Sequence, residues 1–289
     1  MNLKIKSPAK INLTLEVINK FSNGLHELRT VMLKLENLKD DLEIKIKKGP
    51  RKIIIHCDNP EIPLNNKNTC HKAGTAFLDK IKKEVQIEIT LKKKIPIGAG
   101  LGGGSSNAGT LLKNLNKYFN NFFSEKDLIE IAASVGKDIP FFLTEKRVAL
   151  IGGAGEKILK NIDFKNKGCF LIVNPNINVA TPEAYSKLSE DVWYMKNKNR
   201  ENISGKIIEA LISGDDFYAY FFNDFEYSIE KKHPIIKEIK QTMKAFGAQG
   251  VLMSGSGSTV FGWFADKQKS HLAQKNIQKK YKKYLVEIG

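Results

Sequence analysis

The chain has 289 residues, 42% of them hydrophobic, which is enough to form one large domain or two ordinary domains with their own cores. Lysine and arginine total 47 against 31 aspartate and glutamate residues, so the formal net charge is +16 at pH 7. This composition excludes a disordered chain, a collagen-like fibre and a miniprotein, and it raises nucleic acid, an anionic membrane or a phosphorylated small molecule as partners.

The cationic excess consists of lysine rather than arginine. Only four of the 47 basic residues are arginine, which proteins that read nucleic acid favour for bidentate contacts to phosphates and bases. The densest run of lysines, residues 267–283, has the pattern of a terminal amphipathic helix with few aromatic residues. We therefore expect a solvated helix face there, and nucleic acid is not the expected partner.

The cysteines and the first ten residues indicate in which cellular compartment the protein is expected. Three cysteines without C-x-x-C spacing favour neither a disulfide framework nor a thiolate metal site. No apolar run approaches the roughly 20 residues of a membrane span, and residues 1–10 lack the apolar core of a signal peptide. We expect a soluble protein of the reducing cytoplasm without a membrane partner, either a monomer or a homodimer.

The first part of the chain has the alternating pattern of strands. Apolar residues at every second position predict strands at residues 11–17, 31–35, 42–46 and 53–55. A helix is predicted over residues 70–83, followed by a strict period-2 strand over residues 85–91 that runs directly into a glycine-rich segment. Helices are expected next, over residues 105–119 and 124–136.

The second part alternates helices and strands. Strands are predicted at residues 148–151 and 170–173, with a polar connection at 160–167 that we take as the boundary between domains 1–160 and 161–289. Thr181-Pro182-Glu183 predicts a helix start, because a capping residue is followed by proline at the first helical position and by an acid. Further helices are predicted at 202–212, 234–246 and 267–283, and strands at 249–253, 259–264 and 284–288. The fold class is therefore α+β in both halves.

The glycine-rich segment carries the clearest chemical signal. Five of the seven residues from Gly98 to Gly104 are glycine, so the backbone can adopt positive φ values and several N–H groups can converge on one anion. The helix that follows adds the positive end of its dipole. The segment predicts a phosphate-binding loop, but it lacks the lysine of a Walker A motif because Ser105 follows the last glycine. Cationic and acid–base groups must then come from elsewhere in the chain.

Two charged residues among apolar neighbours are candidates for those groups. Lys10 lies in Ser7-Pro-Ala-Lys-Ile-Asn-Leu13, and Asp138 lies in Gly136-Lys-Asp-Ile-Pro-Phe-Phe142. Burial beside an opposite charge is how active sites hold an ammonium and a carboxylate in working states. Residues 253–259 form a second loop of small residues between two predicted strands, which is either a tight turn or another wall of a nucleotide site.

Residues 7–13, 96–107 and 252–261 resemble, in order, the three motifs of the GHMP small-molecule kinases. Within that superfamily the resemblance is strongest to the kinases of 4-diphosphocytidyl-2-C-methyl-D-erythritol, because residues 23–28, 136–141 and 181–185 look like segments particular to them. It implies a two-domain fold, with an N-terminal domain like the second domain of ribosomal protein S5 and a ferredoxin-like C-terminal domain. It also implies ATP-dependent phosphorylation of the substrate's 2-hydroxyl in the non-mevalonate isoprenoid pathway.

The resemblance implies roles for individual residues. Asp138 would be the base that takes the proton of the substrate hydroxyl, and Lys10 would stabilise that carboxylate and the charge on the transferred phosphoryl group. Asn12 would orient the methylerythritol end of the substrate, His26 would hydrogen-bond the cytosine edge, and Thr181 with Tyr185 would complete the cytidine pocket, Tyr185 stacking on the base. Magnesium is expected with ATP, although no ligand can be named from sequence. The residues expected to wrap the ATP phosphates are Pro96, Ile97, Gly98, Ala99, Gly100, Leu101, Gly102, Gly103, Gly104, Ser105 and Ser106.

Three positions depart from the pattern of these kinases. Leu25 replaces a tyrosine that would cover the other side of the cytosine, Lys137 replaces a small residue, and Gly109 stands where alanine is common. Two alternative functions stay open at this point. One is a GHMP kinase with a different acceptor, and the other is a basic RNA-binding protein, whose affinity would depend strongly on salt.

Overall fold

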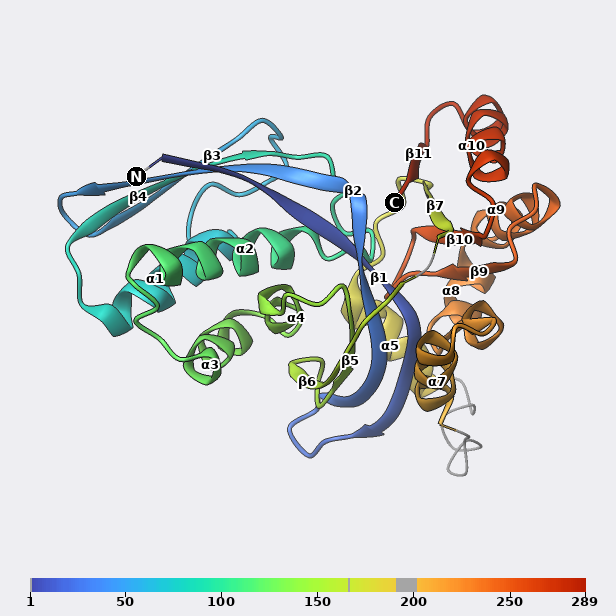
Figure 1. Ribbon diagram of the computed structural model, residues 1–289, viewed down its shortest axis with the longest axis horizontal. Coiled ribbons are helices and arrows are strands. Elements are labelled where there is room, and N and C mark those ends of the chain that lie inside the picture. Colours follow the sequence, from blue (N-terminus) through green and yellow to red (C-terminus); the bar gives the residue numbers. More distant parts are fainter. Residues whose placement is uncertain (1, 166, 191–201) are drawn as a thin grey trace.

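The structure is a computed structural model that describes residues 2–165, 167–190 and 202–289. Two sheets with their helices lie side by side (Figure 1). In the described part of the chain, the larger sheet has seven strands in the order β3-β4-β2-β1-β8, with β5 on β2 and β6 on β5, and the smaller has four in the order β11-β7-β10-β9. The strands are β1 (Asn2–Lys20), β2 (His26–Lys48), β3 (Lys52–Cys57), β4 (Val85–Lys92), β5 (Val148–Gly152), β6 (Lys157–Ile162), β7 (Cys169–Asn174), β8 (Phe222–Asn223), β9 (Gly250–Met253), β10 (Val260–Phe264) and β11 (Leu285–Ile288).

Helices cover one face of each sheet (Figure 1). In the N-terminal half, α1 and α2 pack on the buried side chains of β4, which alternate as the sequence pattern predicts. In the C-terminal half, α9 and α10 pack on the smaller sheet. The helices are α1 (Thr69–Ile81), α2 (Gly103–Tyr118), α3 (Glu125–Val135), α4 (Ile139–Leu143), α5 (Thr181–Glu190), α7 (Ile203–Ser213), α8 (Glu226–Lys232), α9 (Ile235–Ala245) and α10 (Lys267–Lys280), together with the 3₁₀ turn η1 (Phe217–Tyr220).

The prediction of separate strands at 31–35 and 42–46 was wrong, because both belong to the single long strand β2. It pairs with β1 along almost its whole length, and the pairing shifts register between Pro8 and Lys10 and again between Asn12 and Thr14. Such bulges bend a strand and re-aim its side chains. They occur on both sides of Lys10 and Asn12, two of the predicted site residues.

The two halves of the chain share one hydrophobic core. Ile11 and Leu33 of the first half pack in the same cluster as Phe170, Phe261 and Trp263 of the second. In addition, β1 pairs in parallel with the short strand β8. The expected boundary at 160/161 lies inside β6, which ends at Ile162, and the division of the chain there stays a prediction. In the three described ranges we find no helix with the length and apolar character that a membrane crossing requires.

Candidate functional site

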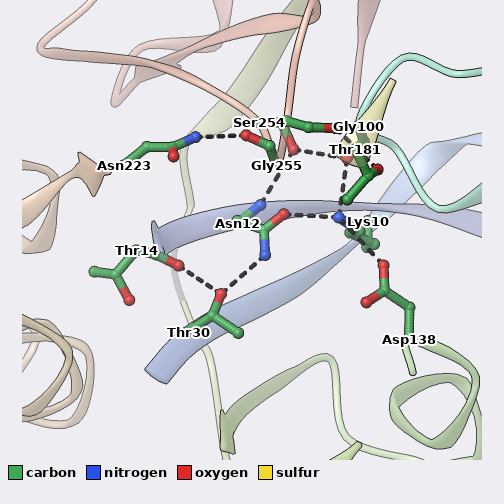
Figure 2. A network of polar contacts seen from close by, with 11 residues as sticks. Lys10, Asn12, Thr14, Thr30, Gly100, Asp138, Thr181, Asn223, Ser254 and Gly255 are labelled. Atoms are coloured by element: carbon green, nitrogen blue, oxygen red, sulfur yellow. Dashed lines mark hydrogen bonds and ion pairs between the residues drawn. The ribbon is translucent and has the colours of Figure 1, made fainter. Parts of the chain in front are cut away.

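Lys10 lies at the centre of the polar network in Figure 2, with only 5% of its side chain exposed. Its Nζ donates hydrogen bonds to Asn12 Oδ1 at 2.7 Å and to the Gly100 carbonyl at 3.0 Å, and lies 3.5 Å from Asp138 Oδ2. The strand alternation of β1 puts Lys10 and Asn12 on this face, while Ile11 packs into the shared core. The structure therefore brings Lys10 and Asp138, which are 128 positions apart, into one ion pair.

Asn12 is held by a buried network of hydrogen bonds (Figure 2). Its Nδ2 donates to Thr30 Oγ1 at 2.8 Å, and Thr30 in turn donates to the Thr14 carbonyl at 2.5 Å. Its backbone N–H donates to Ser254 Oγ at 3.3 Å, and that hydroxyl donates to the Gly100 carbonyl at 3.0 Å. The amide orientation of Asn12 is thus fixed, because its oxygen accepts from Lys10 and its nitrogen donates to Thr30.

The glycine-rich loop has the conformation that its composition predicts. Gly98, Gly100 and Gly102 have φ values of 62°, 75° and 67°, and α2 begins directly after them at Gly103. A Cβ at Gly100 would lie 2.1 Å from the Ser254 carbonyl, so no other residue fits there. The loop and the N-terminus of α2 line the cavity described below, and a backbone of this conformation can present several N–H groups to an anion.

Asp40 holds the segment that leads into this loop. The sequence analysis did not predict this role of Asp40. It is fully buried, forms an ion pair with Lys93, and accepts the backbone N–H groups of Lys94 and Ile95 at 2.8 and 2.9 Å. Asn107 of α2 donates to the same carboxylate at 3.0 Å. The sequence alone suggests that Asp40 is a solvated charge at the end of a strand. Its role depends on contacts with residues that lie 53 to 67 positions away in the chain.

A cavity of about 500 Å³ lies between the loop and Lys10. Its lining includes the polar residues Asn12, Thr30 and Asp138 and the apolar residues Ile62 and Leu91. Lys67, Asn68 and Lys93 also line it, and none of the three was predicted. Nine of the predicted phosphate-loop residues line this cavity: Pro96, Ile97, Gly98, Ala99, Gly100, Gly102, Gly103, Gly104 and Ser105.

The other two predicted loop residues do not reach the cavity with their side chains. Leu101 is buried in the shared core, and the buried Ser106 hydroxyl forms a 2.6 Å hydrogen bond with that of Ser7. Both therefore secure the loop from behind. Their predicted contact with ATP rests on the backbone alone.

A second cavity, of about 630 Å³, adjoins the first. It is lined by His26, Leu25 and Lys137, and also by Lys20 and Ala154. The two cavities share four lining residues, which are Leu28, Asp138, Thr181 and Tyr185. Asp138 therefore lies where a ligand in one cavity meets a ligand in the other.

His26 and Tyr185 lie together as predicted, but in an arrangement that was not predicted. Their rings stack on each other with a centroid distance of 4.5 Å and an interplanar angle of 18°, and Phe225 meets Tyr185 edge-on at 4.8 Å. Burial, with a smaller contribution from Lys20, lowers the pKa of His26 below its usual value. Burial and the charge of Asp138 raise the pKa of Tyr185 to about 12. Both rings are therefore neutral at pH 7.

Thr181, the remaining predicted substrate residue, and two of the three departures, Leu25 and Lys137, line the second cavity. The Thr181 hydroxyl is exposed and lies 3.4 Å from the Ser256 hydroxyl. Leu25 is 44% exposed and covers no ring, and Lys137 Nζ lies 3.6 Å from Glu156 Oε2. The presence of glycine rather than alanine at position 109 has a steric explanation, because a Cβ there would lie 2.7 Å from Phe142 Cβ.

No group of three or more His, Cys, Asp or Glu side chains that could hold a metal ion occurs within the described ranges. Asp138 is the one carboxylate among the residues that line the first cavity there, and Ser105 adds a hydroxyl. This donor set does not form a cage for a cation by itself. It suits a hard cation that arrives with most of its oxygen ligands already supplied by phosphate groups.

Family models agree with the class of protein that the fold and the loop define. Residues 68–146 match the GHMP kinases N terminal domain, and residues 207–283 match the GHMP kinases C terminal domain. A homoserine kinase structure from Cytophaga hutchinsonii superimposes with a TM-score of 0.77 at 18% identity, covering 100% of this chain and 93% of the other. The chain thus has the GHMP kinase fold.

Its relatives narrow the class further. A 4-diphosphocytidyl-2-C-methyl-D-erythritol kinase from Desulfotalea psychrophila is 38% identical over 264 residues, which are 91% of this chain and 85% of the relative. The corresponding kinase from Clostridium botulinum strain Loch Maree is 36% identical over 285 residues, or 97% and 98% of the two chains. A crystal structure of 4-(cytidine 5'-diphospho)-2C-methyl-D-erythritol kinase has a TM-score of 0.80 at 28% identity, covering 99% and 98%. The chain belongs to the family of 4-diphosphocytidyl-2-C-methyl-D-erythritol kinases.

Proposed function

We propose that this protein transfers the γ-phosphoryl group of ATP to the 2-hydroxyl of 4-diphosphocytidyl-2-C-methyl-D-erythritol, giving the 2-phosphate and ADP. The reaction belongs to the non-mevalonate isoprenoid pathway. The observation that carries the proposal is the Lys10–Asp138 ion pair at the junction of two adjoining cavities. One cavity has a phosphate loop and the other has the neutral rings of His26 and Tyr185, so a nucleotide donor and a base-bearing acceptor can meet at the pair.

ATP occupies the first cavity in this proposal. The N–H groups of the loop and the N-terminus of α2 bind the phosphates, and Lys93 lines the same cavity with its charge offset by Asp40. The base lies against Ile62 and Leu91, beside the amide of Asn68. The γ-phosphoryl group then points toward Lys10, whose ammonium stabilises the charge that develops on it during transfer.

The acceptor occupies the second cavity. Its 2-hydroxyl hydrogen-bonds to Asp138, which accepts the proton as the oxygen attacks phosphorus, and Asn12, which lines the adjoining first cavity, orients the methylerythritol end. The cytosine stacks on the aromatic pair of His26 and Tyr185, with Thr181 at its edge. Because Tyr185 is covered by His26 on one side and by Phe225 at another, the base either stacks on His26 or displaces it.

Magnesium enters with ATP in this proposal. Asp138 and the Ser105 hydroxyl are the side chains of the described cavity that suit it, together with phosphate oxygens. The ion would neutralise phosphate charge and so make the phosphoryl group more accessible to attack. The three free thiols fit a reaction in the reducing cytoplasm.

The test is acceptor-dependent release of ADP by the purified protein with ATP and magnesium. We expect ADP release with 4-diphosphocytidyl-2-C-methyl-D-erythritol, and only background release without it or with free 2-C-methyl-D-erythritol, which lacks the base. Equal rates with and without the cytidine group would identify a GHMP kinase with a different acceptor. No turnover with any acceptor, together with tight, salt-dependent binding to RNA, would refute the kinase assignment.

A further inference from the structure

Lys34 is a half-buried lysine that the proposed reaction does not use. It lies on β2 directly opposite Lys10 of β1 in the strand register. Its Nζ donates a hydrogen bond to the Thr144 carbonyl and lies 5.1 Å from the centroid of the Phe141 ring. Within the described ranges it forms no ion pair. Even partial burial of an ammonium without a carboxylate partner is unfavourable, so the position of Lys34 calls for a reason.

Both contacts of Lys34 are made to α4, the helix that carries the base. Asp138 is the N-cap residue of this five-residue helix, and Thr144 is its C-cap residue. An ammonium at the C-terminal end of a helix satisfies an unpaired carbonyl and complements the helix dipole. The Thr144 hydroxyl is held as well, since it donates to Asn161 Oδ1 of β6 at 2.8 Å.

A helix of one and a half turns transmits a displacement of one end to the other, because it is too short to absorb it by bending. The Asp138 side chain makes no capping hydrogen bond of its own. Its 3.5 Å contact with Lys10 therefore depends on how α4 as a whole is held. On the side facing α2, α4 packs at Gly109.

We propose that Lys34 is a positioning residue for phosphoryl transfer: by holding the C-terminal end of α4, its ammonium keeps the Asp138 carboxylate in contact with Lys10. The inference rests on the proposed function in one respect, which is the role of Asp138 as the base. Lys34 touches neither cavity and acts through α4 alone.

The charged groups around Lys34 make its protonation sensitive to pH. Lys113 of α2 and Glu145, which follows α4, form an ion pair with each other, and the Arg147 guanidinium is paired with Glu36. Burial, and to a smaller extent Lys113, lowers the pKa of Lys34 to about 8, against a smaller opposing effect of Glu145. The ammonium is therefore present below pH 8 and is lost as the pH rises through 8, and kcat is expected to fall there.

The experiment compares wild type with Lys34→Met, which keeps the stem but removes the charge and the donor, and with Lys34→Arg, which keeps both. Lys113→Met is the matched control, since it removes a partly exposed lysine next to the same segment. Three quantities are measured: kcat and KM for both substrates as functions of pH, amide hydrogen exchange of residues 139–146, and the Tm.

We expect Lys34→Met to lower kcat about tenfold or more, with both KM values within about twofold of wild type, and to accelerate exchange of residues 139–146. Lys34→Arg should retain most of the activity and shift the alkaline fall in kcat to higher pH. Lys113→Met should keep the wild-type kcat at neutral pH and, because Lys113 helps to lower the pKa of Lys34, should move the alkaline fall in kcat slightly to higher pH. If Lys34→Met does not fold, the pH profile of Lys34→Arg decides the question, and an unshifted alkaline fall overturns the inference.

Two other outcomes would overturn it. One is a kcat of Lys34→Met within about twofold of wild type, whether or not the amide hydrogen exchange of residues 139–146 changes. This result would show that Lys34 has only a structural role. The other is unchanged exchange of residues 139–146 despite lower activity, which would exclude α4 as the route. A wild type that does not turn over the acceptor would refute the proposed function instead. In that case the exchange of residues 139–146 alone tests whether Lys34 holds α4.

Discussion

Single residues of the site differ in how far sequence reveals them. Lys10 and Asp138 were predictable because each is a charge set among apolar neighbours inside a recognisable motif. Asp40 and Lys93 were not, because each looks like an ordinary charge at a strand end and acquires its role only where three segments of the chain meet. The stacking of His26 on Tyr185 also depends on a tertiary contact between β2 and α5 that no local pattern reports.

Replacing Asp138 tests its proposed role as the base. Asp138→Asn keeps the shape of the side chain but removes its capacity to accept a proton, so we expect phosphoryl transfer to be abolished while ATP binding stays nearly intact. Turnover and the affinity for a fluorescent ATP analogue measure the two effects. Asp163→Asn, an exposed carboxylate paired with Lys146, is the control. Turnover within about tenfold of wild type, a loss below ~1.4 kcal/mol, would show that Asp138 is not the base.

The imidazole of His26 is expected to serve the acceptor in its neutral form. Because its pKa lies below the usual value, protonation occurs only as the pH falls below about 6.5. The KM for the acceptor should rise over that range, while the KM for ATP should stay constant. His26→Ala should raise the acceptor KM about tenfold at pH 7.5 and remove this pH dependence, whereas His271→Ala on α10 should change neither. A pH dependence that survives His26→Ala would assign it to another group.

Among the elements, most of those with a clear period followed the sequence, although β2 was divided in two, and four short elements did not follow it. β4 and the Lys-rich α10 have the residues and the exposure that their patterns predict, since α10 buries Ser270, Ala273 and Ile277 and leaves its lysines toward solvent. α4, α8, β6 and β8 were missed. α4 has five residues, two of them phenylalanine and one proline, which is too few to establish a helical period. Such an element is stabilised by its tertiary contacts rather than by its own sequence.

The packing of α2 against α4 predicts an unusual response to a glycine replacement. Alanine within a helix ordinarily stabilises it by about 1 kcal/mol relative to glycine. At Gly109 the added Cβ would lie 2.7 Å from Phe142 Cβ and 3.2 Å from the Ile139 carbonyl. We therefore expect Gly109→Ala to lower the free energy of unfolding by about 1–3 kcal/mol and to reduce kcat, because α4 must move.

Urea denaturation and steady-state kinetics check this expectation. Lys117→Ala, at an exposed position of the same helix, is the control and should leave both quantities unchanged. A Gly109→Ala protein that is more stable than wild type would mean that α4 yields to the methyl group at no cost.

For the whole molecule, the fold class and the order of helices and strands were predictable, but the joining of the halves was not. The α+β class follows from local patterns, whereas the shared core needs the pairing of β1 with β8 and the contact of Ile11 with side chains more than 150 positions away. Neither half therefore buries its apolar side chains without the other. We expect a single cooperative calorimetric transition, and a fragment of residues 1–160 that does not fold alone. Two resolved transitions would contradict this.

Glu16 is a strong link between the halves. It is 1% exposed, and its carboxylate accepts the backbone N–H groups of Ile203 and Ser204, at 3.3 and 3.0 Å, at the start of α7. Glu16→Ala leaves these groups without their partner and should cost about 1–3 kcal/mol in the free energy of unfolding. Glu209→Ala, exposed on α7 itself, should cost less than about 0.5 kcal/mol. Equal effects of the two changes in a denaturation experiment would show that the contact is dispensable.

The continuity of the two cavities has a consequence for inhibitor design. Because they share Asp138, Leu28, Thr181 and Tyr185, a single molecule can occupy both without leaving the protein. A nucleotide fragment and a cytidine fragment joined by a short linker past Asp138 would bind the second site at a high effective concentration, and so with an affinity far above that of either fragment. Kinases that bind ATP in a similar way but lack the second cavity would engage only half of such a molecule, so the proposed placement of the cytidine group makes the junction at Asp138 a source of selectivity.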